Sequence, residues 1–236
     1  EYAVLSGLEP ALLGVHQFNP YRRLAKHCVP SLAHYLRSIG YKTICVHPYA
    51  ASFYRRNNAM PLLGFDEFID IRAFTKDDYF GAYVSDAALG RKVTELVQAH
   101  TEQPVFVHVI TMENHGPLHW ETVSANEAKA LMQQPVPKGA EDLLPYVRHI
   151  QHTDQLLQQL QQALAASPRP AGLCMFGDHV PIMSGVYQQL GEPDGSTDYL
   201  LWRSDDAIAQ PHASVDDSLT AAQLGSAFLS FMGFKA

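Results

Sequence analysis

The sequence predicts an α/β fold in which helices cover both faces of a mainly parallel sheet. Three amphipathic helical segments each precede a short apolar run that is typical of a buried strand. The helices are expected at residues 31–39, 84–100 and 143–166, and the strands at 41–46, 104–111 and 172–176. Such alternation indicates parallel strands joined by crossover helices. The 236 residues, 47% of them hydrophobic, can bury one sizeable core, and we expect a single domain over residues 1–236.

The first unit has clear boundaries. Leu32, Leu36 and Ile39 fall on one helical face, and Gly40 follows as a C-terminal cap. The run at 41–46 is then rich in β-branched and aromatic residues, as strands are.

The second unit combines an amphipathic helix with the most strongly patterned strand of the chain. Leu89, Val93 and Leu96 are in register over residues 84–100. Residues 104–111, Pro-Val-Phe-Val-His-Val-Ile-Thr, follow as the strand. The polar stretch at 118–142 has little pattern and is expected to be a surface excursion.

The third unit contains the longest predicted helix. Its apolar stripe consists of Leu143, Val147, Ile150, Leu157, Leu160 and Leu164. Asp154 falls on this stripe, and a buried carboxylate there would need partners. A further strand is expected at 199–202 and a last helix at 218–232.

Composition excludes several functional classes. The formal net charge is −7 and no basic run occurs, so nucleic-acid binding is not expected. Three scattered cysteines do not form a disulfide framework or a zinc ribbon. No apolar stretch reaches the ~18 residues that span a bilayer.

Each of the three strands that follow a predicted helix, at 41–46, 104–111 and 172–176, is followed by a polar group that includes a histidine. His47 follows the first strand, Asn114 and His115 the second, and Asp178 and His179 the third. Because the carboxyl ends of parallel strands share one edge, these groups are expected to converge. An aspartate beside a histidine offers two ligands to a divalent metal. Alternatively, Asp178 caps a turn and His179 is a surface residue.

The chemistry that suits this edge is transfer of an anionic group. Arg55 or Arg56 could clamp a phosphate or sulfate, and a histidine could protonate the leaving oxygen. The alternative for the arginines is a solvated loop, and for His115 a turn position. Neither a Gly-x-Ser-x-Gly motif nor a Gly-rich phosphate loop is found, so no nucleophile is evident.

These motifs resemble lipoteichoic acid synthase-like phosphoglycerol transferases of the sulfatase and alkaline phosphatase superfamily. The resemblance extends over most of the chain. It rests on Glu1–Leu8, Gly40-Tyr41, His47, Phe53-Tyr54-Arg55-Arg56, Gly64–Asp70, Ile110–Pro117, the helix segment Tyr146–Leu157 with Asp154, and Gly177-Asp178-His179.

The resemblance implies roles for several residues. Asp178 and His179 would be metal ligands, for Mn²⁺ or Mg²⁺. The phosphoglycerol headgroup would be held by His47, Tyr54, Arg56 and His115, with His115 also catalytic. Tyr54 departs from the family, which often has Trp at this position.

The resemblance also implies that part of the catalytic apparatus lies upstream of Glu1. The family's nucleophilic threonine and a further acidic metal ligand precede the matching position. We therefore expect the domain to be incomplete at its N-terminus and inactive as given.

The expected reaction is metal-dependent transfer of a phosphoglycerol-type headgroup from a phospholipid to a cell-surface glycan, through a phospho-threonine intermediate. The alternatives are a sulfatase or phosphodiesterase on the same scaffold and a non-catalytic domain that binds anions or glycans. By resemblance, the protein acts at the cell envelope, on the outward-facing side of the plasma or inner membrane. Any membrane contact would come from segments outside this sequence.

Overall fold

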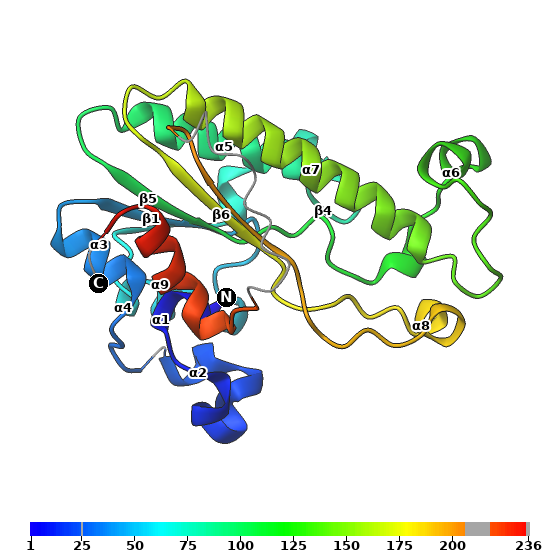
Figure 1. Cartoon of the computed structure of the whole chain (residues 1–236), viewed down its shortest axis with the longest axis horizontal. Coiled ribbons are helices and arrows are strands. Elements are labelled where there is room, and N and C mark those ends of the chain that lie inside the picture. Colours follow the sequence, from blue (N-terminus) through cyan, green and yellow to red (C-terminus); the bar gives the residue numbers. More distant parts are fainter. Residues whose placement is uncertain (25, 206–217, 235–236) are drawn as a thin grey trace.

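A parallel sheet of three strands lies between the helices of the molecule (Figure 1). Its order is β2 (Glu67–Ile69), β1 (Lys42–Val46) and β5 (Val105–Val109). In the register between β1 and β5, Lys42 pairs with Val105 and Val46 with Val109. The predicted α/β class with a mainly parallel sheet is confirmed.

The structure is a computed structural model that describes residues 1–24, 26–205 and 218–234. No helix in this described part of the chain combines the length and the apolar character needed to cross a membrane.

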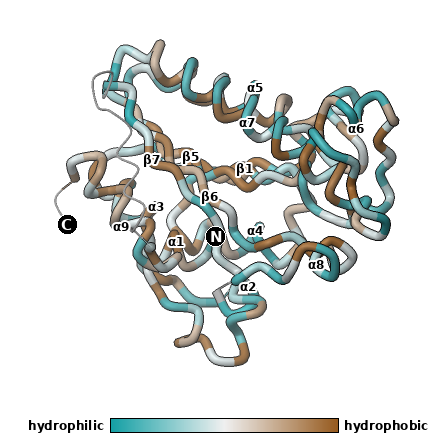
Figure 2. Tube along the Cα trace, turned by 45° about the vertical axis from the view of Figure 1, so that its right-hand side comes forward, coloured by the Kyte–Doolittle hydropathy of each residue, from teal (hydrophilic) through white to brown (hydrophobic). Residues whose placement is uncertain are grey.

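Helices cover both faces of the sheet because successive residues of β1 point to opposite sides. Ile44 and Val46 pack beneath α5 (Asp86–Ala99) and α7 (Leu143–Ala165), with Leu89, Val93, Leu156 and Leu160. Cys45 points the other way, into a core with Tyr2, Leu5, Tyr21, Ala33, Ala59, Met60, Leu63 and Phe65. Figure 2 shows β1 and β5 as hydrophobic strands between these layers.

The second core is built by short helices from the first third of the chain. They are α1 (Tyr2–Ser6), α2 (Pro20–Leu24), α3 (Leu32–Ser38) and α4 (Arg56–Leu62). Ser31 caps α3 by accepting a hydrogen bond from the backbone N–H of His34 at 3.2 Å, and Gly40 follows with φ of 95°. The predicted boundaries of this helix are confirmed.

The strand at 172–176 is present but pairs differently from the expectation. β6 (Gly172–Phe176) forms an antiparallel pair with β7 (Tyr199–Arg203). Within the described residues it has no ladder to the three-stranded sheet, although Leu173 packs against the core under α5 and α7. The prediction that this strand belongs to the parallel sheet is therefore wrong in its pairing.

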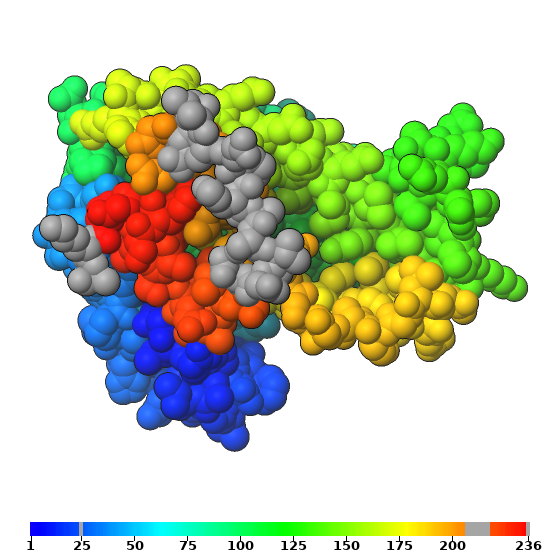
Figure 3. All heavy atoms as spheres, in the orientation of Figure 1, coloured from blue at the N-terminus to red at the C-terminus, as the bar shows by residue number. Residues whose placement is uncertain are grey.

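A third apolar cluster lies away from the sheet, beside the N-terminal end of α7. It joins the 118–142 stretch to α8 (Ser184–Leu190) through Leu118, Ala140, Met183 and Val186. Figure 3 shows this part of the molecule, in green and yellow-orange, projecting away from the rest. The predicted surface excursion also contains α6 (Ala125–Leu131), capped by Ser124.

The remaining short elements are β3 (Tyr79–Phe80), β4 (Tyr83–Val84) and the 3₁₀ turns Pro10–Phe18, Phe53–Arg55, Ile71–Ala73, Lys76–Asp78 and Leu118–Trp120.

Asp154 corrects a second expectation. It is exposed on α7 and accepts a hydrogen bond from Nε2 of Gln158 at 3.1 Å. The buried face of the helix instead passes through His149, Leu156 and Leu160, while Ile150 is 43% exposed. The predicted apolar stripe differs from the buried face because His149, a polar residue, lies on the face that touches the core.

The last helix, α9 (Ala221–Phe231), packs against α1 at a glycine. A Cβ atom added to Gly225 would lie 2.3 Å from the carbonyl oxygen of Val4, so backbone would have to move. We expect Gly225→Ala to lower the free energy of unfolding by about 1–3 kcal/mol, although alanine is ordinarily the better helix former. Urea denaturation measures this, with Ser230→Ala on the exposed side of α9 as control; a stabilised Gly225→Ala protein would contradict the packing.

Candidate functional site

Arg56 is the centre of a buried polar group at the carboxyl end of β1. It is the first residue of α4 and only 4% exposed. Its Nη2 donates to Oε1 of Glu1 at 2.7 Å, and its Nη1 donates to Nε2 of His47 at 3.1 Å. Rings of Tyr21 and Tyr54 lie 5.0 and 5.4 Å from the guanidinium carbon. Nε of Arg56 has no hydrogen-bond partner in the described part of the chain.

The backbone before Arg56 is unusual. Tyr54 and Arg55 both have left-handed conformations, with φ of 52° and 58°. Two consecutive non-glycine residues in this region cost energy, and such strain is found mostly at functional sites. The turn leaves Tyr54 and Arg55 exposed while Arg56 is buried. The segment after β1 thus contains a strained turn and the start of α4.

His47 is a neutral partner of Arg56. It is 1% exposed, and burial together with the Arg56 charge lowers its pKa to about 4. Since Nε2 accepts from Arg56, the proton must be on Nδ1, which donates to the carbonyl oxygen of Ile110 at 3.3 Å. His47 therefore orients the guanidinium and holds the end of β1 against the end of β5.

His115 lies in the neighbouring loop and is exposed. Its Nδ1 donates to the carbonyl oxygen of Gly116 at 2.8 Å, which leaves Nε2 free for proton transfer. Tyr83 and Tyr49 connect the two loops: Tyr49 lies 6.1 Å from His47, and Tyr83 lies 6.3 Å from Tyr49 and 5.7 Å from His115, measured between ring centroids.

A cavity of about 260 Å³ lies beside these rings. It is lined by Pro48, Tyr49, Ala50, Ile71, Tyr79, Ala82, Tyr83 and Val84. The first two of the three predicted loops therefore lie together, next to an aromatic hollow.

Asp178 and His179 follow β6, as the sequence indicated, and both are exposed. Nε2 of His179 is 3.7 Å from Oδ1 of Asp178, and its Nδ1 donates to the carbonyl oxygen of Val180 at 2.9 Å. Within the described residues, no hydrogen bond or ion pair links Asp178 or His179 to the His47 and His115 loops.

Comparison with known proteins now gives the family. The sulfatase family model matches residues 1–234. The chain belongs to the sulfatase family. A curated relative, the capsular polysaccharide biosynthesis protein RkpI of Rhizobium meliloti, is 34% identical over 215 residues. That match covers 90% of this chain and 37% of RkpI, so the sequence spans little more than a third of that protein.

Solved structures of other proteins share this fold. The lipoteichoic acid synthase LtaP of Listeria monocytogenes gives a TM-score of 0.66 at 20% identity, over 85% of this chain and 51% of LtaP. The phosphoglycerol transferase GacH of Streptococcus pyogenes gives 0.63 at 20% identity, over 81% and 50%. Both neighbours share the fold. The predicted superfamily is confirmed by the family match.

The residues at the end of β6 fit half of a divalent-metal site in this sulfatase-family chain. Asp178 supplies a carboxylate, and His179 supplies a free Nε2 whose ring is fixed by the hydrogen bond from Nδ1. The two donors already face one another. Divalent cations take at least four ligands, so further ligands are required.

A second group of ligand-type residues was missed by the sequence analysis. Glu113, His149 and His152 meet under α7, and Asp86 lies beside them. Burial and the neighbouring Glu113 charge raise the pKa of Asp86 to about 6. The only sequence signal was the spacing of the two histidines, three residues apart on a predicted helix.

His108 on β5 gives a prediction for acid stability. It is 8% exposed, and burial lowers its pKa to about 4. Between that value and the ordinary pKa near 6.5, the unfolded chain binds a proton that the folded chain does not, so stability falls as pH falls. We expect His108→Leu to reduce this loss by an amount on the order of 3 kcal/mol between pH 7 and 4. Urea melts across this range measure it, with exposed His119→Gln as control; equal slopes would contradict the prediction.

Proposed function

We propose that this chain is the headgroup-binding part of a metal-dependent transferase of the sulfatase superfamily. The enzyme moves a phosphoglycerol-type group from a phospholipid to a cell-surface glycan. The observation that carries the proposal is the arrangement of Arg56, His47, Tyr54 and His115 at one end of the sheet, in a sulfatase-family chain. Its relatives include a capsular polysaccharide protein and phosphoglycerol transferases of the same fold.

Arg56 suits an oxyanion. It already holds the carboxylate of Glu1, and its Nε–H has no partner among the described residues. A guanidinium in a mostly buried position binds phosphate more strongly than a solvated one. Tyr54, exposed above the guanidinium, would cover the bound headgroup.

His115 is assigned to proton transfer. The threonine, outside this sequence, attacks phosphorus as its alkoxide, and the bond to the diacylglycerol oxygen breaks as Nε2 of His115 gives that oxygen a proton. A glycan hydroxyl then attacks the phospho-threonine, gives its proton to His115 and receives the phosphoglycerol, and the threonine leaves again as the alkoxide. A divalent cation bound by Asp178 and His179, Mn²⁺ or Mg²⁺, would polarise the phosphoryl group.

Release of diacylglycerol tests the reaction class. The full-length protein is incubated with phosphatidylglycerol vesicles and Mn²⁺. We expect release that stops with chelator and falls at least ~100-fold in Asp178→Asn, because one metal ligand is lost. Asp194→Asn is the matched control, because Asp194 is exposed and accepts a hydrogen bond from the neighbouring Ser196 backbone.

The alternatives predict different outcomes. Turnover of a soluble aryl sulfate or phosphodiester, without any transfer to glycan, would favour a hydrolase. Phosphate binding that depends on Arg56 but not on metal, with no turnover, would favour a non-catalytic domain. No release from phosphatidylglycerol, phosphatidylethanolamine or cardiolipin would contradict the transferase.

The proposed location follows from the proposed substrates. A phospholipid donor and a surface glycan meet at the cell envelope, on the outward-facing side of the membrane. Contact with the membrane is assigned to segments outside this sequence.

A further inference from the structure

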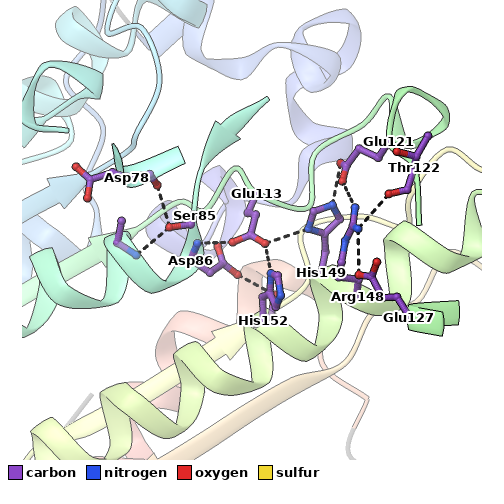
Figure 4. Close-up of polar contacts among 12 residues, drawn as sticks. Asp78, Ser85, Asp86, Glu113, Glu121, Thr122, Glu127, Arg148, His149 and His152 are labelled. Atoms are coloured by element: carbon purple, nitrogen blue, oxygen red, sulfur yellow. Dashed lines mark hydrogen bonds and ion pairs between the residues drawn. The ribbon is translucent and has the colours of Figure 1, made fainter. Parts of the chain in front are cut away.

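Glu113, His149 and His152 form a cluster that the proposed reaction does not use (Figure 4). Glu113 lies in the loop after β5, and the two histidines lie on one side of α7, three residues apart. Nδ1 of His149 is 3.1 Å from Oε1 of Glu113, and Nδ1 of His152 contacts the same oxygen. One ligand atom from each residue lies within 4.8 Å of the others. Three ligand-type atoms thus lie close together.

This spacing is close to that of a bound metal. Ligands at about 2.0–2.1 Å in a tetrahedral zinc site are separated by roughly 3.4 Å. Small side-chain rotations would bring the three atoms to these positions. Two imidazoles and one carboxylate are a ligand set that zinc uses in proteins.

The charge around the cluster also favours a cation. Three carboxylates, from Asp86, Glu113 and Glu121, are mostly or fully buried, and the nearby fixed cation is Arg148. Asp86 is 1% exposed, and its Oδ1 has no hydrogen-bond partner in the described part of the chain. Its other oxygen accepts from Oγ1 of Thr153 at 2.9 Å. Figure 4 shows Asp86 beside Glu113 and His152. A buried carboxylate oxygen without a partner is costly, and a divalent cation would offset that cost.

The surroundings already orient one histidine as a metal ligand. Nε2 of His149 is 2.9 Å from Oε1 of Glu121, and Nη2 of Arg148 donates to the other oxygen of Glu121 at 2.5 Å. Histidine ligands commonly donate their second ring N–H to a carboxylate in this way, which leaves the first nitrogen for the metal.

We propose that Glu113, His149 and His152 bind one divalent cation of the zinc type, at a site separate from Asp178 and His179. The imidazoles favour Zn²⁺ over Mg²⁺, which prefers oxygen ligands. His152, whose side chain is 28% exposed, marks the side from which the ion enters. Asp86 or water supplies the fourth ligand.

The site would brace the loop that carries His115. Glu113 precedes His115 by two residues, and one of its oxygens also accepts from the backbone N–H of Asp86 at 2.6 Å, at the start of α5. A metal here would tie this loop to α5 and α7. The role is structural, because Glu113 and His149 are buried.

Zinc content tests the proposal. The full-length protein carries Asp178→Ala and His179→Ala, so that the other metal position cannot contribute, and is stripped with chelator. We expect it to take up one equivalent of Zn²⁺ by elemental analysis, and its melting temperature to rise with Zn²⁺ but not with Mg²⁺. Co²⁺ should give the intense visible bands of a tetrahedral site.

Variants then assign the ligands. His149→Gln and His152→Gln should each lose the bound equivalent, whereas His119→Gln, an exposed histidine, should keep it. Failure of the background protein to bind Zn²⁺ or to give a Co²⁺ spectrum would overturn the proposal without relying on any cluster variant. Full retention of zinc in folded His149→Gln and His152→Gln proteins would do so as well. In either case the cluster would be a hydrogen-bonded network only.

Discussion

Replacing Arg56 with alanine should lower the free energy of unfolding by about 3–5 kcal/mol, because the substitution leaves the mostly buried Glu1 carboxylate without its ion-pair partner. Burial, the largest single influence, would raise the pKa of Glu1, but the Arg56 charge, the hydrogen bond from Tyr21 and further nearby charges together hold that pKa below its ordinary range. The Glu1 side chain is 16% exposed and that of Arg56 4%, so water cannot replace the lost ion pair well. Chemical denaturation measures the change.

Arg55 provides the control for this result. It is adjacent, exposed and in the same left-handed turn. Arg55→Ala should change the free energy of unfolding by less than about 0.5 kcal/mol. If the two alanine variants were equally stable, Arg56 would not be the buried centre of this group. In a double variant, Glu1→Gln with Arg56→Met, the unpaired carboxylate is removed as well. This variant should recover part of the free energy of unfolding that is lost when Arg56 alone is replaced.

The second large effect is expected on activity. His115→Ala in the full-length protein should reduce headgroup transfer about 10²- to 10⁴-fold, the range for loss of a general acid. Stability should hardly change, because His115 is exposed and Nδ1 of its ring contacts only the adjacent Gly116 carbonyl at 2.8 Å and the Tyr83 hydroxyl at 3.5 Å among the described residues. Diacylglycerol release measures the rate, and thermal melting measures the stability.

His119→Ala is the control that shows whether the loss of transfer is specific to His115. Both histidines are exposed and lie four residues apart in one segment. Transfer by His119→Ala should match the parent protein. A His115→Ala enzyme that retains transfer within about threefold would remove His115 from the proposed chemistry.

Local pattern was enough to predict most of the layered fold. The α3–β1 and α5–β5 units follow from periodicity and capping signals within about twenty residues. The position of His47 and His115 at one sheet edge follows from the rule that parallel strands end together. These predictions depend only on features that are close in the sequence.

The remaining features depend on contacts between distant segments. Glu1 meets Arg56 across 55 positions, and Glu113 meets His149 across 36. Nothing in the local pattern marks a histidine as buried. The predicted buried face of α7 is therefore rotated about the helix axis, so that it includes Asp154 in place of His149. The pairing of β6 with β7 was missed for a similar reason, because strand order is not encoded by apolar runs alone.

Transfer of a labelled headgroup tests the central claim most directly. The full-length protein is given phosphatidylglycerol labelled in the headgroup glycerol, its glycan acceptor and Mn²⁺. The proposed function predicts that label enters the glycan, and that Asp178→Asn and Arg56→Lys block this while Asp194→Asn does not. Label released as free glycerol phosphate at the same rate with or without glycan would contradict it.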